Sequence, residues 1–197
     1  MREKAGGKGE KMAERKDAAG KGTIRSDRLL LEPAGRERLE AERTGGDVFA
    51  AAIDAVVPDS WPMEDLREVL PLFIDAFRRR PEAAVWYGWH WILEEGGRRF
   101  LVGGGGFHGP PDRKGRAEIG YAVAPSFRGR GFASEGTAAL LGWAFARPET
   151  RRIDAETDAG NAPSIRVLEK NRFLPARRSG EGGMIRFTLD RERFLSV

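Results

Sequence analysis

The chain has 197 residues, which suits a single domain, and 40% of them are hydrophobic, enough for a sizeable core. It has no cysteine, which excludes a disulfide framework, a thiolate nucleophile and a cysteine-ligated metal, and two histidines are too few for a His-rich metal site. Lys and Arg number 34 and Asp and Glu 30, so the net charge of +4 does not by itself predict a nucleic-acid surface.

Residues 1–22 are predicted to form a disordered, charged tail ahead of one folded domain, residues 23–197. The tail carries most of the excess positive charge and has almost no apolar side chain to bury. It lacks the apolar region of a secretory signal, and no run of the chain approaches the roughly 20 apolar residues of a membrane span. We therefore expect a cytoplasmic protein without membrane contact, which also suits the absence of cysteine.

The first half of the chain predicts a strand, two helices and a hairpin. The apolar residues of the first strand alternate, those of the helices recur at helical spacing, and a Gly96-Gly97 turn joins the strands of the hairpin. Gly45-Gly46 breaks the first helix, and Pro71 can kink the second. The segments are residues 23–34, 35–56, 65–80 and 84–107.

The second half alternates strands and helices. Residues 117–125 predict a third antiparallel strand that places Glu118 on the face opposite Ile119. A helix, a strand, a helix and a closing strand follow, over residues 132–147, 151–158, 161–173 and 184–194. The order predicts an α/β (α+β) fold with a mixed, mostly antiparallel central sheet flanked by helices.

The stretch "SFRGRGFA" joins the third strand to the next helix. Glycines let the backbone approach a bulky anion, the first turn of a helix offers unpaired N–H groups, and Arg128 and Arg130 add charge. The P-loop string is absent, and Ser134 stands where the dinucleotide fingerprint needs its last glycine. The stretch does match Arg-x-x-Gly-x-Ala at Arg128, Gly131 and Ala133, which predicts a diphosphate cradle.

This pattern resembles the acyl-CoA cradle of the GNAT N-acetyltransferase superfamily. "AEIGYAVAPSFRGRGFASEG", "LLGWAF", "RRIDAETDAGNAPSIRVLEKNRF" and "SDRLLLEP" resemble the branch that contains the ribosomal-protein alanine N-acetyltransferases, over roughly Thr23 to Leu189. The resemblance implies a GNAT-type sheet splayed at the acyl-CoA site. It also implies direct transfer of acetyl from acetyl-CoA to a primary amine in a ternary complex, the amine being a protein N-terminus or a small molecule, with no metal.

The resemblance also implies which residues meet the cosubstrate. The loop would hold the pyrophosphate through backbone N–H groups, the end of the third strand would pair with the pantetheine arm, and the start of the last helix would lie near the thiol. The residues concerned are Ala122, Val123, Arg128, Gly129, Arg130, Gly131, Phe132, Ala133, Ser134, Asn161 and Ser164. Helix capping is a compatible alternative for Asn161 and Ser164.

Catalysis needs a base for the amine and an acid for the leaving thiolate. Glu118 is the candidate base, because family members often use an acidic residue on that strand; its alternative is a strand-edge carboxylate paired with a basic group such as Arg116. Many family members use a tyrosine on the last helix as the acid. This chain has none there, and Ser164 is the substitute we name. Arg172 also departs from the family, which usually has glycine before Phe173.

Trp61, Trp89 and His108 are the candidate acceptor-binding residues, each with packing or solvation as the alternative. The glycine run at residues 103–106 lies within a strand, where a bulge or a close backbone approach is the expected cause.

Two other function classes stay open. A catalytically inactive acyl-CoA sensor or scaffold is suggested by the missing helix tyrosine. RNA binding through "RGRG" is disfavoured because the motif lies between a strand and a helix. The sequence does not decide whether the protein is a homodimer.

Overall fold

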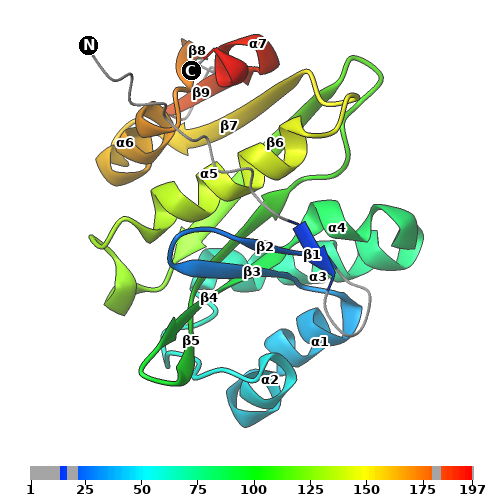
Figure 1. Ribbon diagram of the computed structural model, residues 1–197, viewed down its shortest axis with the longest axis vertical. Helices are drawn as coiled ribbons and strands as arrows, with labels where there is room; N and C mark the ends of the chain where they lie inside the picture. Colours follow the sequence, from blue (N-terminus) through cyan, green and yellow to red (C-terminus); the bar gives the residue numbers. More distant parts are fainter. Residues whose placement is uncertain (1–13, 17–21, 179–182, 197) are drawn as a thin grey trace, which may run out of the picture.

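The computed structural model describes residues 14–16, 22–178 and 183–196, and these build one sheet with helices on both faces (Figure 1). The described strands form a nine-stranded sheet in the order β1-β2-β3-β4-β5-β6-β7-β9-β8. Their bounds are β1 Glu14–Lys16, β2 Gly22–Arg25, β3 Leu29–Pro33, β4 Trp89–Glu95, β5 Arg98–Phe107, β6 Arg116–Val123, β7 Arg152–Asp158, β8 Leu174–Arg178 and β9 Met184–Asp190. Only β6 and β7 among these neighbours pair in parallel, so the predicted mixed, mostly antiparallel α/β architecture is confirmed.

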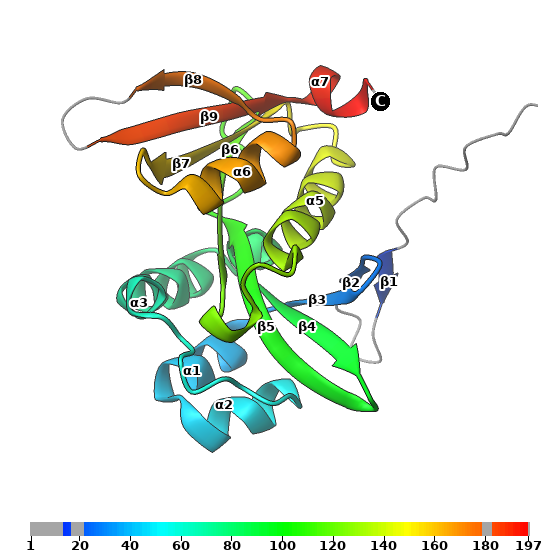
Figure 2. The same cartoon turned by 90° about the vertical axis from the view of Figure 1, so that its left-hand side faces the viewer.

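The helices divide between the two faces of the sheet (Figure 2). Their bounds are α1 Arg36–Thr44, α2 Gly46–Ile53, α3 Glu64–Arg79, α4 Ala84–Tyr87, α5 Phe132–Phe145, α6 Ala162–Lys170 and α7 Arg191–Leu195. The helix α5 lies across one face of the sheet, and α1 to α3 lie on the other side of the β4–β5 hairpin. The crossover that α5 makes is what allows β6 and β7 to run parallel.

Alternating apolar side chains supply both faces with a core. Leu31 and Trp91 pack in the cluster that contains the apolar residues of α5, whereas Leu30 and Ile92 pack with Phe49 of α2. Trp91 lies so close to α5 that a Cβ on Gly136 would stand 2.6 Å from the indole ring. The period of two in these strands therefore fixes which helix meets which face.

The strands β6 and β7 separate soon after they meet. They pair only from Arg116–Glu118 to Arg152–Asp154, while β7 stays paired with β9 along its whole length. Beyond Glu118 one edge of β6 pairs with β5 and the other edge has no strand beside it among the described residues. The sheet is thus splayed between its two halves.

The structure corrects several element predictions. The first predicted strand is two strands, β2 and β3, joined by a tight turn in which Ser26 N donates to Leu29 O at 2.9 Å. Residues 84–87, expected to begin a strand, form α4, and residues 191–194, expected to complete the closing strand, belong to α7. The strand β8 was not predicted. Four apolar residues in a row fit a helical turn and a strand equally well, which explains the error at α4.

The predicted tail, residues 1–22, lies largely outside the described residues. Of that segment the structure describes Gly22 and Glu14–Lys16, which pair with β2. Within the described part of the chain, no helix is long and apolar enough to cross a membrane.

Candidate active site

The loop between β6 and α5 is shaped as an anion cradle. Gly129 (φ 75°) and Gly131 (φ 85°) both adopt the left-handed conformation that side chains disfavour. A short 3-10 turn, Pro125–Phe127, leads into the loop, and Gly131 caps α5 without any side-chain hydrogen bond. No described residue accepts a hydrogen bond from the backbone N–H groups of residues 129–131. Together with the first turn of α5 these donors fit a diphosphate.

Side chains around this loop fix it rather than fill it. Phe132 is 1% exposed, so it can meet a ligand only through its backbone. The Nε of Arg128 donates to Val123 O at 3.1 Å, and Ser134 O accepts from Asn171 Nδ2 at 3.2 Å. The Val123 carbonyl is therefore already paired, although its residue was predicted to contact the pantetheine arm.

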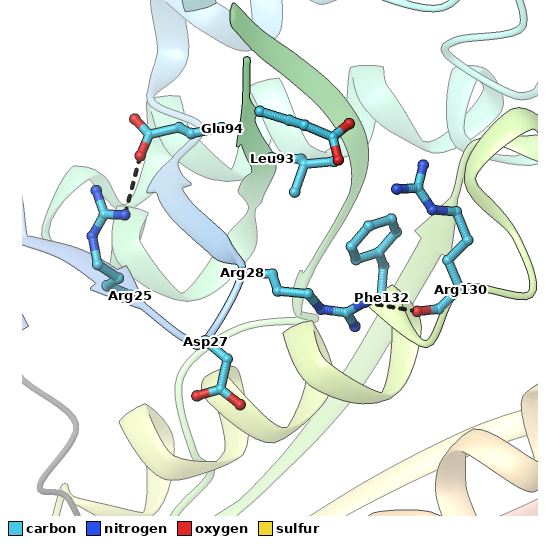
Figure 3. A pocket seen from close by; sticks show the side chains of 8 residues that line it. Arg25, Asp27, Arg28, Leu93, Glu94, Arg130 and Phe132 are labelled. Atoms are coloured by element: carbon cyan, nitrogen blue, oxygen red, sulfur yellow. Dashed lines mark hydrogen bonds and ion pairs between the residues drawn. The ribbon is translucent and has the colours of Figure 1, made fainter. Parts of the chain in front are cut away.

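Arg28 was not predicted from the sequence, and it forms a clamp: its side chain bonds both the loop, at Arg130, and the helix α5, at Glu135. Its Nη1 donates to Arg130 O at 3.1 Å, and its guanidinium lies over the Phe132 ring at 4.6 Å (Figure 3). Its Nε donates to Glu135 Oε2 at 2.7 Å. Burial raises the pKa of Glu135, but hydrogen bonds from Ser26 and Arg28 outweigh it and hold that pKa below 4.5. A single arginine from the β2–β3 turn thus links the loop to its helix.

The splay between β6 and β7 opens into a pocket of about 190 Å³. Strand residues line its sides and the start of α6 closes one end. The lining residues are Ile119, Gly120, Tyr121, Ala155, Glu156, Thr157, Asn161, Ser164 and Leu168. The cradle follows the far end of β6 in the chain, so the same strand borders the pocket and leads into the loop.

The start of α6 is a capped helix that enters this pocket. Asn161 Oδ1 accepts from Ser164 N at 3.1 Å, which confirms the capping alternative for Asn161. Ser164 Oγ lies 3.0 Å from Tyr121 Oη, a contact that sequence reasoning did not foresee. Contact of either residue with a cosubstrate stays a prediction.

Glu118 and His108 form a pair at the other face of β6. Glu118 Oε1 lies 3.2 Å from His108 Nδ1, so its partner is the histidine and not Arg116. The hydrogen bond between them raises the pKa of His108 above 6.5, more than burial lowers it. The same bond holds the pKa of Glu118 below 4.5, with further help from the charges of His108 and Arg186. Two residues predicted for separate roles thus titrate as a coupled unit.

The two tryptophans predicted for the acceptor lie in the core. Trp89 is 2% exposed and packs edge-on against Trp143. Trp61 is 5% exposed; its Nε1 donates to Glu42 Oε1 at 2.7 Å and its ring lies beside Gly104. This packing favours the structural alternative for both residues.

The glycine run of β5 has the close approach expected for it. A Cβ on Gly103 would stand 2.5 Å from Ala122 O, and one on Gly106 would stand 2.4 Å from Tyr87 O. The register between β4 and β5 also shifts at Trp91/Ile92, since Trp91 pairs with Gly103 and Ile92 with Leu101.

Comparison with known proteins gives the same family that the sequence resembles. The model of the acetyltransferase (GNAT) domain family matches residues 28–174. The chain is 35% identical to the uncharacterized N-acetyltransferase YoaA of Bacillus subtilis over 156 residues, 76% of this chain and 81% of that protein. It is 33% identical to the uncharacterized N-acetyltransferase YjdG of the same organism over 121 residues, 61% of this chain and 71% of that protein.

Solved structures share the fold. RimJ of Mycobacterium smegmatis, whose crystal structure is a complex with CoA-disulfide, superposes with a TM-score of 0.59 at 19% identity. The match covers 85% of this chain and 84% of that chain.

Proposed function

We propose that this chain, which belongs to the acetyltransferase (GNAT) domain family, transfers an acetyl group from acetyl-CoA directly to a primary amine. The family is shown by a match that spans residues 28–174. The acceptor we propose is a protein N-terminus or a small amine, bound together with acetyl-CoA in a ternary complex. Acetyl-CoA supplies an activated thioester, and the chain's own residues bind it, exclude water and move protons.

The observation that carries the proposal is the splay of β6 from β7 beside an open anion cradle. The backbone groups of β6 beyond Glu118 that face away from β5 have no strand partner in the described sheet. Such groups can hydrogen-bond the amides of an extended pantetheine arm as a missing strand would. The N–H groups of residues 129–131, which no described residue accepts, support the assignment of this loop to the diphosphate.

Proton transfer divides between the two faces of β6. Glu118 and His108 lie on one face, while the Tyr121 and Ser164 hydroxyls meet on the other. We assign the amine to the Glu118 side, where the coupled pair takes its proton directly or through water. The leaving sulfur then lies on the hydroxyl side. A base and an acid on opposite sides of one gap suit direct transfer without a covalent enzyme intermediate.

The proposal predicts saturable binding of acetyl-CoA that a negative charge in the cradle weakens. In Gly131→Glu a carboxylate would repel the diphosphate, and a side chain would strain a backbone at φ 85°. Isothermal titration calorimetry of acetyl-CoA into the folded variant should show binding at least tenfold weaker.

Gly45→Glu is the matched control, because Gly45 (φ 78°) also has positive φ but lies between α1 and α2. It should bind acetyl-CoA as the unmodified protein does. If the folded, unmodified protein bound no acetyl-CoA, the proposal would fail; if Gly131→Glu bound it normally, the cradle assignment would fail.

A further inference from the structure

Tyr121 projects from β6 to the start of α6, into the pocket between the splayed strands. Its Oη donates to Ser164 O at 3.2 Å and lies 3.0 Å from Ser164 Oγ. Tyr121 and Ser164 both line the pocket, with Thr157 of β7. A phenol therefore stands in the gap although α6 itself carries no tyrosine.

We propose that Tyr121 is the general acid of the reaction and that Ser164 is a positioning residue that orients the phenol and stabilises its anion. This inference rests on the proposed acetyl transfer. It replaces the assignment of the acid to Ser164 with a residue on a different element of the fold.

Acidity separates the two hydroxyls. A phenol has a pKa of about 10 and an alkyl thiol one of about 8.5, so a proton can pass between them at little cost. An alkyl hydroxyl is closer to water, at about 15.7, and holds its proton too tightly to protonate a thiolate. Of the two groups that meet in the pocket, only the phenol is an effective acid.

The surroundings of Tyr121 favour the protonated phenol before the C–S bond breaks. Burial raises the pKa of Tyr121 above 10.0, and the hydrogen bond with Ser164 partly opposes that rise. The phenol has one proton, which it donates to the Ser164 carbonyl, so the Ser164 hydroxyl donates to Tyr121 Oη. That second bond strengthens when Tyr121 becomes an anion.

The step balances as follows. The amine nitrogen forms a bond to the carbonyl carbon, and the C–S bond breaks with its electron pair going to sulfur. Tyr121 gives its phenolic proton to that sulfur, while the Glu118–His108 pair takes the proton that the nitrogen loses. The products are an acetylated amine and the free thiol; the Glu118–His108 pair then releases its proton to solvent, and Tyr121 takes one up from solvent.

The first test needs no acceptor amine. A donor near the sulfur stabilises a thiolate, so the thiol pKa of bound CoA, followed by ultraviolet absorbance of the thiolate, should rise by about one unit in Tyr121→Phe. Tyr87→Phe is the matched control: the chain has only two tyrosines, and Tyr87 packs against Phe77 in the core, away from the pocket. It should leave the thiol pKa unchanged.

The second test is kinetic and uses the best acceptor from a panel of an N-terminal alanine peptide, an N-terminal serine peptide and spermidine. In Tyr121→Phe we expect kcat to fall by about 10²-fold or more, with the Kd of CoA changed less than about threefold. The basic limb of the pH–rate profile, where the acid loses its proton, should disappear.

Ser164→Ala separates the roles of the two hydroxyls. If Ser164 acts through Tyr121, its loss should cost kcat only about tenfold, and the double variant should be no slower than Tyr121→Phe alone. If kcat instead fell by about 10²-fold in Ser164→Ala and stayed intact in Tyr121→Phe, the acid would be Ser164 and the inference would be overturned.

The outcomes distinguish the two proposals. If CoA does not bind the unmodified protein, the proposed function fails. If CoA binds and its thiol pKa is the same in Tyr121→Phe and Tyr87→Phe, the inference alone fails.

Discussion

At the scale of residues, the proposed mechanism makes the base, the His108–Glu118 pair, dependent on pH. A protonated His108 occupies Glu118 Oε1, at 3.2 Å, and leaves the pair unable to take a further proton near neutral pH. Once His108 loses that proton, the pair has one negative charge and can act as a base. Because the pKa of His108 is raised above 6.5, this change occurs at a higher pH than for a free histidine.

We therefore expect kcat/KM to increase as the pH rises through the raised pKa of His108. In His108→Gln the acidic limb of the profile of kcat/KM against pH should move to lower pH, because Glu118 then titrates alone. The pH–rate profiles of the two proteins check this. Identical acidic limbs would show that the pair does not take the amine's proton.

The same pair should contribute a little stability in a defined window. The raised histidine pKa stabilises the fold below pH 6.5 and the lowered glutamate pKa stabilises it above pH 4.5. The contribution should fade as the pH falls through the pKa of Glu118 or rises through that of His108. Because the His108 side chain is 58% exposed, solvent screening keeps the effect small.

Several site residues could be predicted from the sequence and their partners could not. The glycines and arginines of the loop are adjacent in the chain, so a local pattern predicts a glycine turn that leads into a helix, and the structure has that turn. The clamp joins Arg28 to Glu135, 107 positions away, and the phenol joins Tyr121 to Ser164, 43 positions away. Such contacts depend on how helices and strands pack together, and the spacing of apolar residues within one segment does not contain that information.

At the scale of elements, the β2–β3 turn controls a loop that lies over 100 positions later in the chain. Arg28 bonds the loop at the Arg130 carbonyl and α5 at Glu135, and it fills the space behind Gly131. The clamp holds the loop's N–H groups in place before a ligand arrives, which lowers the entropy cost of binding.

Arg28→Ala is therefore expected to weaken acetyl-CoA binding by about tenfold, although the side chain serves only to position the loop. Arg25→Ala is the control, because Arg25 lines a surface pocket together with Arg28 and Arg130 but pairs with Glu94 (Figure 3). Calorimetry on both variants checks the difference. Equal Kd values for both would remove Arg28 from the cradle.

Element prediction succeeded where the apolar period was long and failed where segments were short. The helices α5 and α6 and the β4–β5 hairpin were found, whereas the four residues of α4 and the five of α7 were not. Arg172 shows a related limit: its φ of 68° is a conformation that glycine adopts freely, and its guanidinium bonds Ser196 after α7. The sequence marked Arg172 as unusual but could not show α7 beside it.

At the scale of the whole molecule, the fold consists of two half-sheets joined at one corner. The corner is tied where Gly115 O accepts from Arg151 N at 2.8 Å and from Arg152 N at 3.1 Å. From there β6 stays with β5 and β7 with β9, so the strands diverge. The order of elements predicted the sheet, and the family resemblance implied its splay; periodicity alone would not have placed the opening.

Family membership leaves the acceptor open, and a protein that only binds acyl-CoA would share this fold. The two cases differ in turnover. A binding protein would hold acetyl-CoA without producing free thiol, and the geometry of the Glu118 side would then have no chemical role.

The most direct test is to incubate the protein with acetyl-CoA labelled in the acetyl group and the panel of primary amines, and to follow acetylated amine by mass spectrometry and free thiol by colorimetry. The account predicts equal amounts of both products with at least one amine, and loss of both in Glu118→Gln while acetyl-CoA still binds. Saturable binding of acetyl-CoA without acetylation of any amine would contradict it.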